Sequence, residues 1–220
     1  MKNIRFVASY SGGKDGALAF YRAVQSGFRP LALLTTYNES AGRSWFHGVP
    51  SDLLHTVSAS IGVPLELIKT GEGNGYAADF EAALERLKKT KGARACVFGD
   101  IDIQAHYDWC DARCKAAGLE SAFPLWNGDR RRLVYELIDL GFKAVITIVD
   151  SSKLSERFLG QTITREIAEE IAAAGADICG ENGEYHTFVY DGPIFKTPVN
   201  FKRGDIVRRG GYSILPVLNV

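Results

Sequence analysis

The fold of this chain is decided by FVASYSGGKDGALAFY, residues 6–21. Its first part is an apolar run typical of a buried strand, and from Asp15 onward apolar residues recur with helical period. Between them stands the glycine pair Gly12-Gly13, which lets the backbone turn sharply and approach a ligand closely. The stretch therefore predicts a strand, a tight turn and a helix whose free N–H groups favour an anion.

Outward from this stretch, short β-rich runs alternate with longer segments of helical period. Strands are expected at residues 4–9, 31–37, 65–68, 95–99 and 144–149. Helices are expected at residues 15–26, 51–61, 76–89, 105–117, 131–140 and 164–174, several of them closed by a glycine. This alternation predicts the α/β class, with a Rossmann-like parallel sheet that carries helices on both faces.

The pattern changes at residues 123–129, FPLWNGD, which supply a proline, a glycine and a turn. Past Gly180 the chain becomes β-like and rich in glycine and proline. We therefore expect a larger α/β domain at residues 1–123 and a smaller α+β domain at residues 124–220.

Composition and charge limit the partners. In 220 residues, 26 Lys plus Arg balance 26 Asp plus Glu, so no overall field draws the chain to nucleic acid. No apolar run approaches the roughly 20 residues that span a bilayer, and the N-terminus lacks a signal-peptide core. Four cysteines without a CxxC pair predict reduced thiols. We expect a cytoplasmic protein without a membrane or nucleic-acid partner, and we keep a homodimer open.

The phosphate loop, residues 11–16, has the residue types of a phosphate site. Ser11 offers a hydroxyl, Lys14 offers a mobile cation, and the glycines allow close backbone approach. The spacing matches neither a Walker loop nor G-x-G-x-x-G. Asp15 beside a polyanion is best explained as a partner of Mg²⁺ or of the lysine, which indicates a metal-bound nucleotide. The alternative is a glycine turn capped by Ser11.

A second cluster, GENGEYHT, occupies residues 180–187. Glu181 and Glu184 can bind a cation or accept hydrogen bonds from an amine, and we expect both to face the phosphate loop. The alternative is a solvated turn whose acids cap a helix. Further candidates for the substrate side are Asn182, His186, Thr187, His47 in the loop after the second strand, and Asp100 and Asp102 at the carboxyl end of the fourth strand.

Several of these motifs resemble those of a known family. SGGKDG (11–16) resembles the PP-loop, S-G-G-x-D-[ST], of the N-type ATP pyrophosphatases. CGENGEYHTFVYDGPIF (179–195) resembles the signature of the diphthine–ammonia ligase family within that superfamily, and FHGVP (46–50), FGDIDIQAHYDWC (98–110) and PLW (124–126) follow the expected order. The chain departs from the pattern at Gly16, where most members carry a hydroxyl, and at Gln161, where many relatives carry a basic residue.

The resemblance implies an ATP-binding first domain and a substrate-binding second domain. It implies a ligase that adenylates a carboxylate, releases pyrophosphate and forms an amide with ammonia. The residues implied to hold the ATP phosphates are Ser11, Gly12, Gly13, Lys14 and Gly16. The expected catalytic residues are Lys14, Asp15, Glu181 and Glu184, and Asp15 is also expected to place Mg²⁺.

The family divides by substrate. Members of the archaeal and eukaryotic type amidate diphthine on elongation factor 2, whereas bacterial relatives are linked to corrinoid salvage. GENGEYHT and GDIDIQAHYDW are more similar to the bacterial group. Two other functions stay open: a PP-loop enzyme that modifies tRNA, which would more often show CxxC pairs and a basic surface, and a sensor that binds ATP without turnover. The acidic signature after Gly180 favours the ligase over the sensor.

Overall fold

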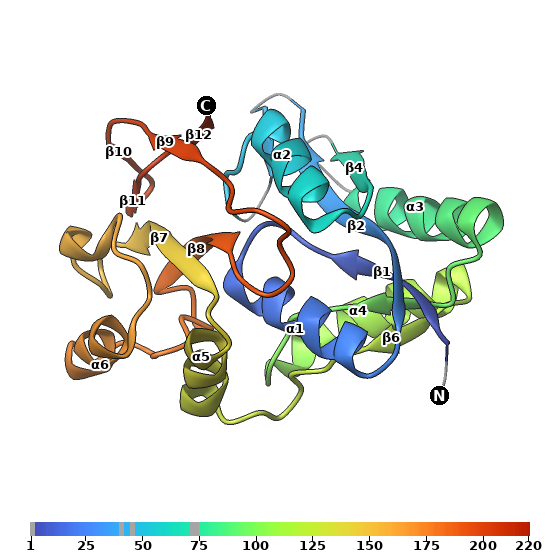
Figure 1. The fold of residues 1–220 in the computed structure, drawn as a ribbon, viewed down its shortest axis with the longest axis horizontal. Coiled ribbons are helices and arrows are strands. Elements are labelled where there is room, and N and C mark those ends of the chain that lie inside the picture. Colours follow the sequence, from blue (N-terminus) through green and yellow to red (C-terminus); the bar gives the residue numbers. More distant parts are fainter. Residues whose placement is uncertain (1–2, 40–41, 45–46, 71–74) are drawn as a thin grey trace.

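A computed structural model describes residues 3–39, 42–44, 47–70 and 75–220, in which two main sheets lie side by side (Figure 1). Helix α1 (Lys14–Gln25) lies between them, at the centre of the molecule. The first sheet is built from the N-terminal half of the chain, and the second from the C-terminal half. The chain passes from one sheet to the other through residues 123–142.

The first sheet has the order β3-β2-β1-β5-β6, with β4 paired to β2. Its parallel strands are β1 (Arg5–Ser9), β2 (Arg29–Asn38), β4 (Leu65–Thr70), β5 (Ala95–Val97) and β6 (Glu120–Ala122). Only β3 (Arg43–Ser44) runs antiparallel to its neighbour among these described strands. The predicted α/β class with a parallel sheet is therefore confirmed, although the strands β3 and β6 are too short to have been predicted from periodicity.

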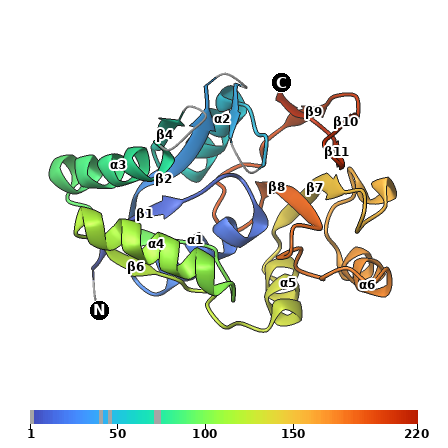
Figure 2. The same cartoon turned by 180° about the vertical axis from the view of Figure 1, so that it is seen from behind.

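Helices cover both faces of the first sheet (Figures 1 and 2). Alternation along β1 sends Phe6 to the core that holds α1 and α2 (Ser51–Ile61), and Val7 to the core that holds α3 (Tyr76–Lys91) and α4 (Gln104–Ala117). The predicted helices begin and end within two residues of the observed ones. In the ranges that the structure describes, no helix has the length and apolar character needed to cross a membrane.

The second sheet is antiparallel and has the order β10-β11-β7-β8. Its strands are β7 (Lys143–Asp150), β8 (Tyr185–Asp191), β10 (Val207–Arg209) and β11 (Tyr212–Ile214). It is accompanied by helices α5 (Arg130–Asp139) and α6 (Arg165–Ala173), a short 3-10 turn (Glu156–Phe158), and the pair β9 (Phe201–Arg203) and β12 (Val217–Asn219).

The strand expected at residues 144–149 is confirmed as β7, which pairs antiparallel with β8 and β11. It lies past residue 123, in the part of the chain where the sequence predicts the smaller α+β domain. Alternation identifies such a strand from its own residues, whereas the direction of its pairing depends on partners that come later in the chain.

The two sheets share one apolar core at the phosphate loop. The Val189 N–H of β8 donates to the Gly12 carbonyl at 2.8 Å, and the Lys14 N–H donates to Thr187 Oγ1 at 3.1 Å. The same apolar cluster contains Phe6 of the first sheet and Phe188 of the second. The phosphate loop is thus held from both sides.

Candidate active site

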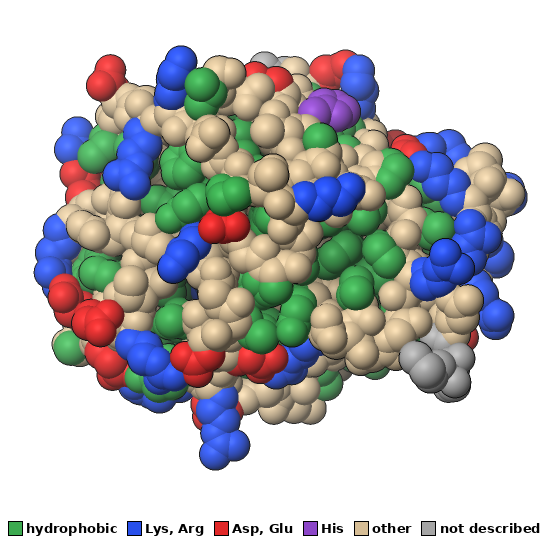
Figure 3. Space-filling view, viewed as in Figure 1, with side chains coloured by type: hydrophobic (Ala, Val, Ile, Leu, Met, Phe, Trp, Pro, Cys, Tyr) green, Lys and Arg blue, Asp and Glu red, His purple; other side chains and the backbone are tan. Residues whose placement is uncertain are grey.

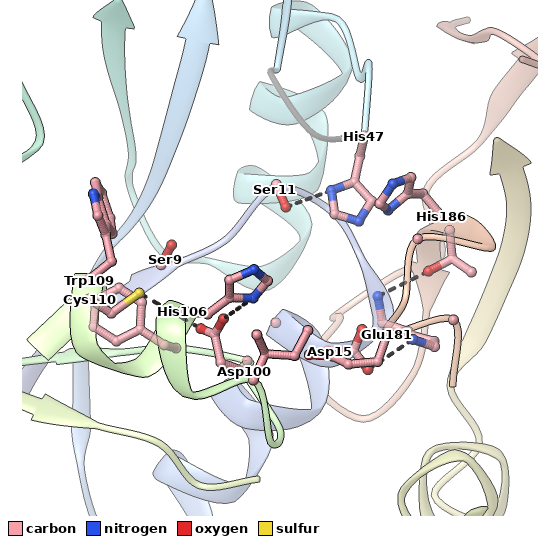
Figure 4. A pocket seen from close by; sticks show the side chains of 18 of the residues that line it. Ser9, Ser11, Asp15, His47, Asp100, His106, Trp109, Cys110, Glu181 and His186 are labelled. Carbon is pink, nitrogen blue, oxygen red and sulfur yellow. Dashed lines mark hydrogen bonds and ion pairs between the residues drawn. The ribbon is translucent and has the colours of Figure 1, made fainter. Parts of the chain in front are cut away.

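A pocket of about 740 Å³ opens where the carboxyl ends of β1 and β5 meet β8 and the turn before it (Figure 4). Parallel α/β sheets bind ligands at this edge. Of the predicted site residues, those that line it are Ser11, Lys14, Asp15, Gly16, His47, Asp100, Glu181, Asn182, His186 and Thr187. The structure therefore brings together residues that are up to 176 positions apart, by subtraction of 11 from 187.

The phosphate loop presents a helix N-terminus to this pocket. Gly12 has a φ of +94°, which favours glycine, and Gly13 caps α1 without a side-chain hydrogen bond. A Cβ on Gly99 would lie 2.7 Å from the backbone of Asp15 and Gly16, so the chain after β5 packs directly on the first turn of α1. This first turn, whose N-cap residue has no side chain to cover it, is a suitable place for an anion.

Lys14 supplies a fixed positive charge at this end. Its buried ammonium lies 2.7 Å and 3.0 Å from the two carboxylate oxygens of Asp15, and 5.4 Å from the ring centre of Tyr185. Burial alone would lower the pKa of Lys14, but the charge of Asp15, the neighbouring Cys179 and Tyr185, and the hydrogen bond to Asp15 together raise that pKa well above its usual value. Lys14 therefore stays protonated.

Two histidines lie beside the phosphate loop. His47 Nδ1 is hydrogen-bonded to Ser11 Oγ at 2.8 Å, and its Nε2 lies 2.3 Å from where a Cβ on Gly13 would be. The rings of His47 and His186 meet edge to face at 5.1 Å. Burial is the main cause that lowers the pKa of both histidines. His186 and then the Lys14 charge lower the pKa of His47 further, and the Lys14 charge lowers that of His186. Two neutral imidazoles thus lie at the phosphate side, and Phe46 of the predicted FHGVP motif lies outside the described residues.

Glu181, in the turn before β8, lies across from Asp15 of the phosphate loop, as Figure 4 shows. Burial, followed by the negative charge of Asp15, raises the pKa of Glu181 to about 7, against the opposing charge of Lys14. A carboxyl group in this condition can accept or release a proton near neutral pH.

Glu184 does not line the pocket, contrary to expectation. Its side chain is 5% exposed, and its carboxylate accepts hydrogen bonds from the backbone N–H groups of Asp177 (3.3 Å) and Asn182 (3.1 Å) and from the Asn182 amide (3.2 Å). The two carboxylates therefore have different roles. Glu181 faces the pocket, whereas Glu184 holds the turn together by hydrogen bonds within it.

Asp102 is also displaced from its predicted place. It is not among the lining residues, and its carboxylate accepts two hydrogen bonds from Arg130, at 2.7 Å and 2.8 Å. This hydrogen-bonded arginine lowers the pKa of Asp102. Asp100, two residues earlier, does line the pocket, lies 3.5 Å from His106 Nδ1, and has a pKa raised by burial.

The far end of the pocket is aromatic, which the sequence reasoning missed. Trp109 of α4 lies 5.6 Å from Tyr76 and 5.5 Å from Phe80 of α3, measured between ring centres, and all three line the pocket. Cys110 of α4 lines it too. Periodicity marks these residues as a buried face, but the approach of α3 to α4 turns part of that face into a wall suited to a flat or apolar group.

Two exposed arginines near the second sheet form ion pairs with acids. Arg208 donates to Glu156 at 2.6 Å and 2.7 Å, and Arg131 pairs with Glu169. On the face in Figure 3, acidic and basic side chains are mixed at the left and bottom, whereas basic side chains gather at the right edge. Arg131 and Arg208 therefore have the character of solvated, paired surface charges.

No complete protein-made metal site is present in the described ranges, where no group of three or more His, Cys, Asp and Glu side chains converges to hold an ion. Mg²⁺ is commonly held by one or two carboxylates together with the phosphates of a nucleotide. Asp15, next to the helix N-terminus, fits such a shared site.

Comparison with protein families divides the chain as the sheets do. The model of the diphthamide synthase N-terminal domain matches residues 4–121, and that of the diphthamide synthase C-terminal domain matches residues 129–215.

Two individual relatives that align over most of their length are named diphthine–ammonia ligases. The chain is 24% identical over 240 residues to a diphthine–ammonia ligase of Danio rerio, covering 97% of this chain and 92% of that protein. It is 23% identical over 238 residues to that of Mus musculus, covering 97% and 89%. A solved structure described as a predicted subunit of tRNA methyltransferase from Methanocaldococcus jannaschii is 16% identical, with a TM-score of 0.48 over 89% of this chain and 100% of that one.

Proposed function

This chain belongs to the diphthamide synthase family, and from that premise we propose that it is an ATP-dependent ligase that adenylates a carboxylate and converts it to an amide with ammonia. AMP and pyrophosphate are the other products. The relatives that align over nearly their whole length are named diphthine–ammonia ligases, which supports formation of a carbon–nitrogen bond.

One observation carries the proposal: Glu181 faces Lys14 and Asp15 across a single pocket. Amide formation from a carboxylate needs a good leaving group, stabilisation of the charge on that group, and removal of a proton from the incoming ammonia. The phosphate loop offers stabilisation of the leaving group's charge, and Glu181 offers removal of the proton from ammonia. They do so from opposite walls of the pocket.

The residues present fit ATP and Mg²⁺. The first turn of α1, with Ser11, Gly13 and the Lys14 ammonium, suits the phosphates, and Asp15 suits a shared Mg²⁺. When bound, Mg²⁺ would neutralise phosphate charge. Gly16 brings no hydroxyl, and the side chains at the loop that could donate instead include the Ser11 hydroxyl and the imidazoles of His47 and His186.

The side chains then have separate roles. Lys14 stabilises the negative charge on the departing pyrophosphate, because it is a buried cation at the helix N-terminus. Glu181, as a carboxylate, accepts the proton that ammonia loses when its nitrogen bonds to the activated carbonyl carbon and AMP leaves. Asp100 and the aromatic end are candidates for holding the acceptor or the base of the nucleotide.

The acceptor is proposed to be a small-molecule or protein-borne carboxylate, and the sequence favours the bacterial, corrinoid-related group over diphthine. A tRNA substrate is less well supported, since Arg130, Arg131 and Arg208 already form ion pairs. The alternative is a sensor that binds ATP without turnover, which is favoured by the absence of a side-chain hydroxyl at Gly16. Cytoplasmic location and a homodimer stay predictions.

The test is product analysis of the purified protein with ATP, Mg²⁺, ¹⁵N-ammonium and a panel of carboxylates that includes corrinoid acids and a diphthine-bearing elongation factor. The expected result is AMP, pyrophosphate and a ¹⁵N-amide with one acceptor, lost in Lys14→Ala and kept in Lys202→Ala, which changes an exposed lysine of β9. ATP that is bound but unchanged with every acceptor would favour the sensor.

A further inference from the structure

Arg130 connects the loop after β5 with the turn before β8. As the first residue of α5, it donates from Nε and Nη2 to both oxygens of Asp102, at 2.8 Å and 2.7 Å. Its Nη1 donates to Asp177 Oδ2 at 2.6 Å. The planar guanidinium thus binds one carboxylate with a two-bond fork and a second carboxylate with its remaining edge, a geometry that a lysine cannot reproduce.

The Asp177 side of this link fixes the Glu181 turn. Asp177 Oδ2 also accepts the Glu181 N–H at 2.9 Å, and Asp177 Oδ1 accepts the Cys179 N–H at 3.1 Å. On the other side of Glu181, the Asn182 N–H is held by Glu184. The backbone is therefore hydrogen-bonded both at Glu181 and immediately after it, and Arg130 bonds the carboxylate that makes the first of these contacts.

The Asp102 side anchors the link to the first sheet. Asp102 lies in the loop between β5 and α4, in which Asp100 lines the pocket. This loop is also held by the Asn127 N–H, which donates to the Ile101 carbonyl at 2.7 Å. A displacement of the turn relative to the first sheet would therefore break the bonds of Arg130 either to Asp102 or to Asp177.

From this geometry we infer that Arg130 is a positioning residue, which holds Glu181 opposite the phosphate loop by joining Asp102, in the loop after β5, to Asp177, in the segment before β8. Arg130 does not itself line the pocket. The inference rests on the proposed function only where activity is measured, because the placement of Glu181 is a property of the protein alone.

The charge of Arg130 affects the pKa of Glu181, which can be measured separately from the stability of the fold. Burial and Asp15 raise the pKa of Glu181 to about 7, whereas Lys14 and Arg130 oppose that rise. Loss of the guanidinium charge therefore moves the Glu181 titration to higher pH. Arg131 is the matched control, since it is the next residue of the same helix and pairs instead with Glu169, away from the turn.

The experiment compares the wild type with Arg130→Gln, Arg130→Lys and Arg131→Gln. Carboxyl ¹³C NMR of glutamate-labelled protein follows the Glu181 titration, with its signal assigned by Glu181→Gln. Amide hydrogen exchange follows residues 177–184. We expect a higher titration midpoint and exchange about tenfold faster in Arg130→Gln, and neither change in Arg131→Gln.

Arg130→Lys keeps the charge without the fork, so its midpoint should stay near the wild-type value while exchange in the turn still accelerates. It carries the test if Arg130→Gln does not fold. An unchanged midpoint and unchanged exchange in Arg130→Gln, or equal changes in Arg131→Gln, would overturn the inference.

A third readout uses the acceptor found by product analysis. We expect kcat to fall by about 10- to 100-fold in Arg130→Gln, with a much smaller change in KM for ATP. The acid limb of the kcat–pH profile, in which kcat falls as Glu181 is protonated, should move to higher pH. Full kcat with an unmoved acid limb would count against the inference. A wild type without ligase activity would count against the proposed function alone, because the NMR and exchange results stand without turnover.

Discussion

The phosphate loop and the turn at residues 177–184 face each other across one pocket, but they are built in opposite ways. The phosphate loop is shaped by its backbone, since its glycines leave the N-terminus of α1 without a side-chain cap, and its positive charge comes from one buried side chain, Lys14. The turn works through side chains, and its hydrogen bonds decide which carboxylate faces the pocket. The role of the phosphate loop follows from a local strand–turn–helix pattern. The role of each carboxylate in the turn depends instead on which hydrogen bonds its side chain makes in the folded protein.

The largest expected effect lies at the phosphate loop. Lys14→Ala removes the buried cation and leaves Asp15 without its ion pair, so we expect kcat/KM to fall by about 1,000-fold or more. AMP formation measured at fixed acceptor, with Lys202→Ala as the control, checks it. Activity within tenfold of the wild type would mean that the backbone of the loop suffices.

At the turn, Glu181→Gln keeps the shape of the side chain and removes the proton acceptor. We expect kcat to fall by about 100-fold, with the Kd for ATP nearly unchanged. Single-turnover rates and calorimetric ATP binding separate the two quantities. A loss of ATP affinity without a loss of rate would move Glu181 from the amine step to nucleotide binding.

The same residue predicts a pH dependence. With the pKa of Glu181 in the unliganded protein at about 7, the acid limb of kcat/KM should have its midpoint near that pH, and kcat/KM should fall about tenfold per pH unit below it. The limb should vanish in Glu181→Gln. For stability the sign is reversed: a folded pKa above the ordinary 4.5 means that this group destabilises the fold as pH rises from 4.5 to about 7.

Glu184→Gln should affect stability rather than chemistry. A glutamine can accept some of the three hydrogen bonds of this buried carboxylate, but its NH₂ group opposes an N–H donor. We expect a loss of about 1 to 3 kcal/mol, seen as a Tm lower by several degrees, with kcat per folded molecule within about threefold of the wild type. A collapse of kcat in fully folded protein would restore Glu184 to the catalytic group.

The smallest effect is expected for Gly16→Ser. A Cβ at this position would lie 3.5 Å from the Ser9 carbonyl, which is ordinary contact, so the hydroxyl common in the PP-loop can be added without displacing the backbone. We expect ATP to bind roughly two- to fivefold more tightly, as one added hydrogen bond allows. Weaker binding, measured by calorimetry, would indicate that the missing hydroxyl is part of how this loop works.

Much of the first sheet and of the phosphate loop could be predicted, because their patterns are local. β1 and α1 follow from the period of residues 6–21, and Lys14 and Asp15 follow from their place at a helix N-terminus. The orientation of Glu184 and Asp102 could not be predicted, since it depends on bonds to Asn182 and Arg130. The aromatic wall was missed for a similar reason, because it exists only where α3 and α4 meet.

The hydrogen bond from Val189 to the Gly12 carbonyl, with the apolar core around it, has a consequence for the evolution of the chain. A half-gene encoding only the first sheet would leave Gly12 without the Phe188 ring beside it and without the hydrogen bond from Val189, so it would encode an incomplete nucleotide site with exposed apolar surface. We therefore expect recombination that exchanges the second half to succeed only where it preserves these contacts of β8.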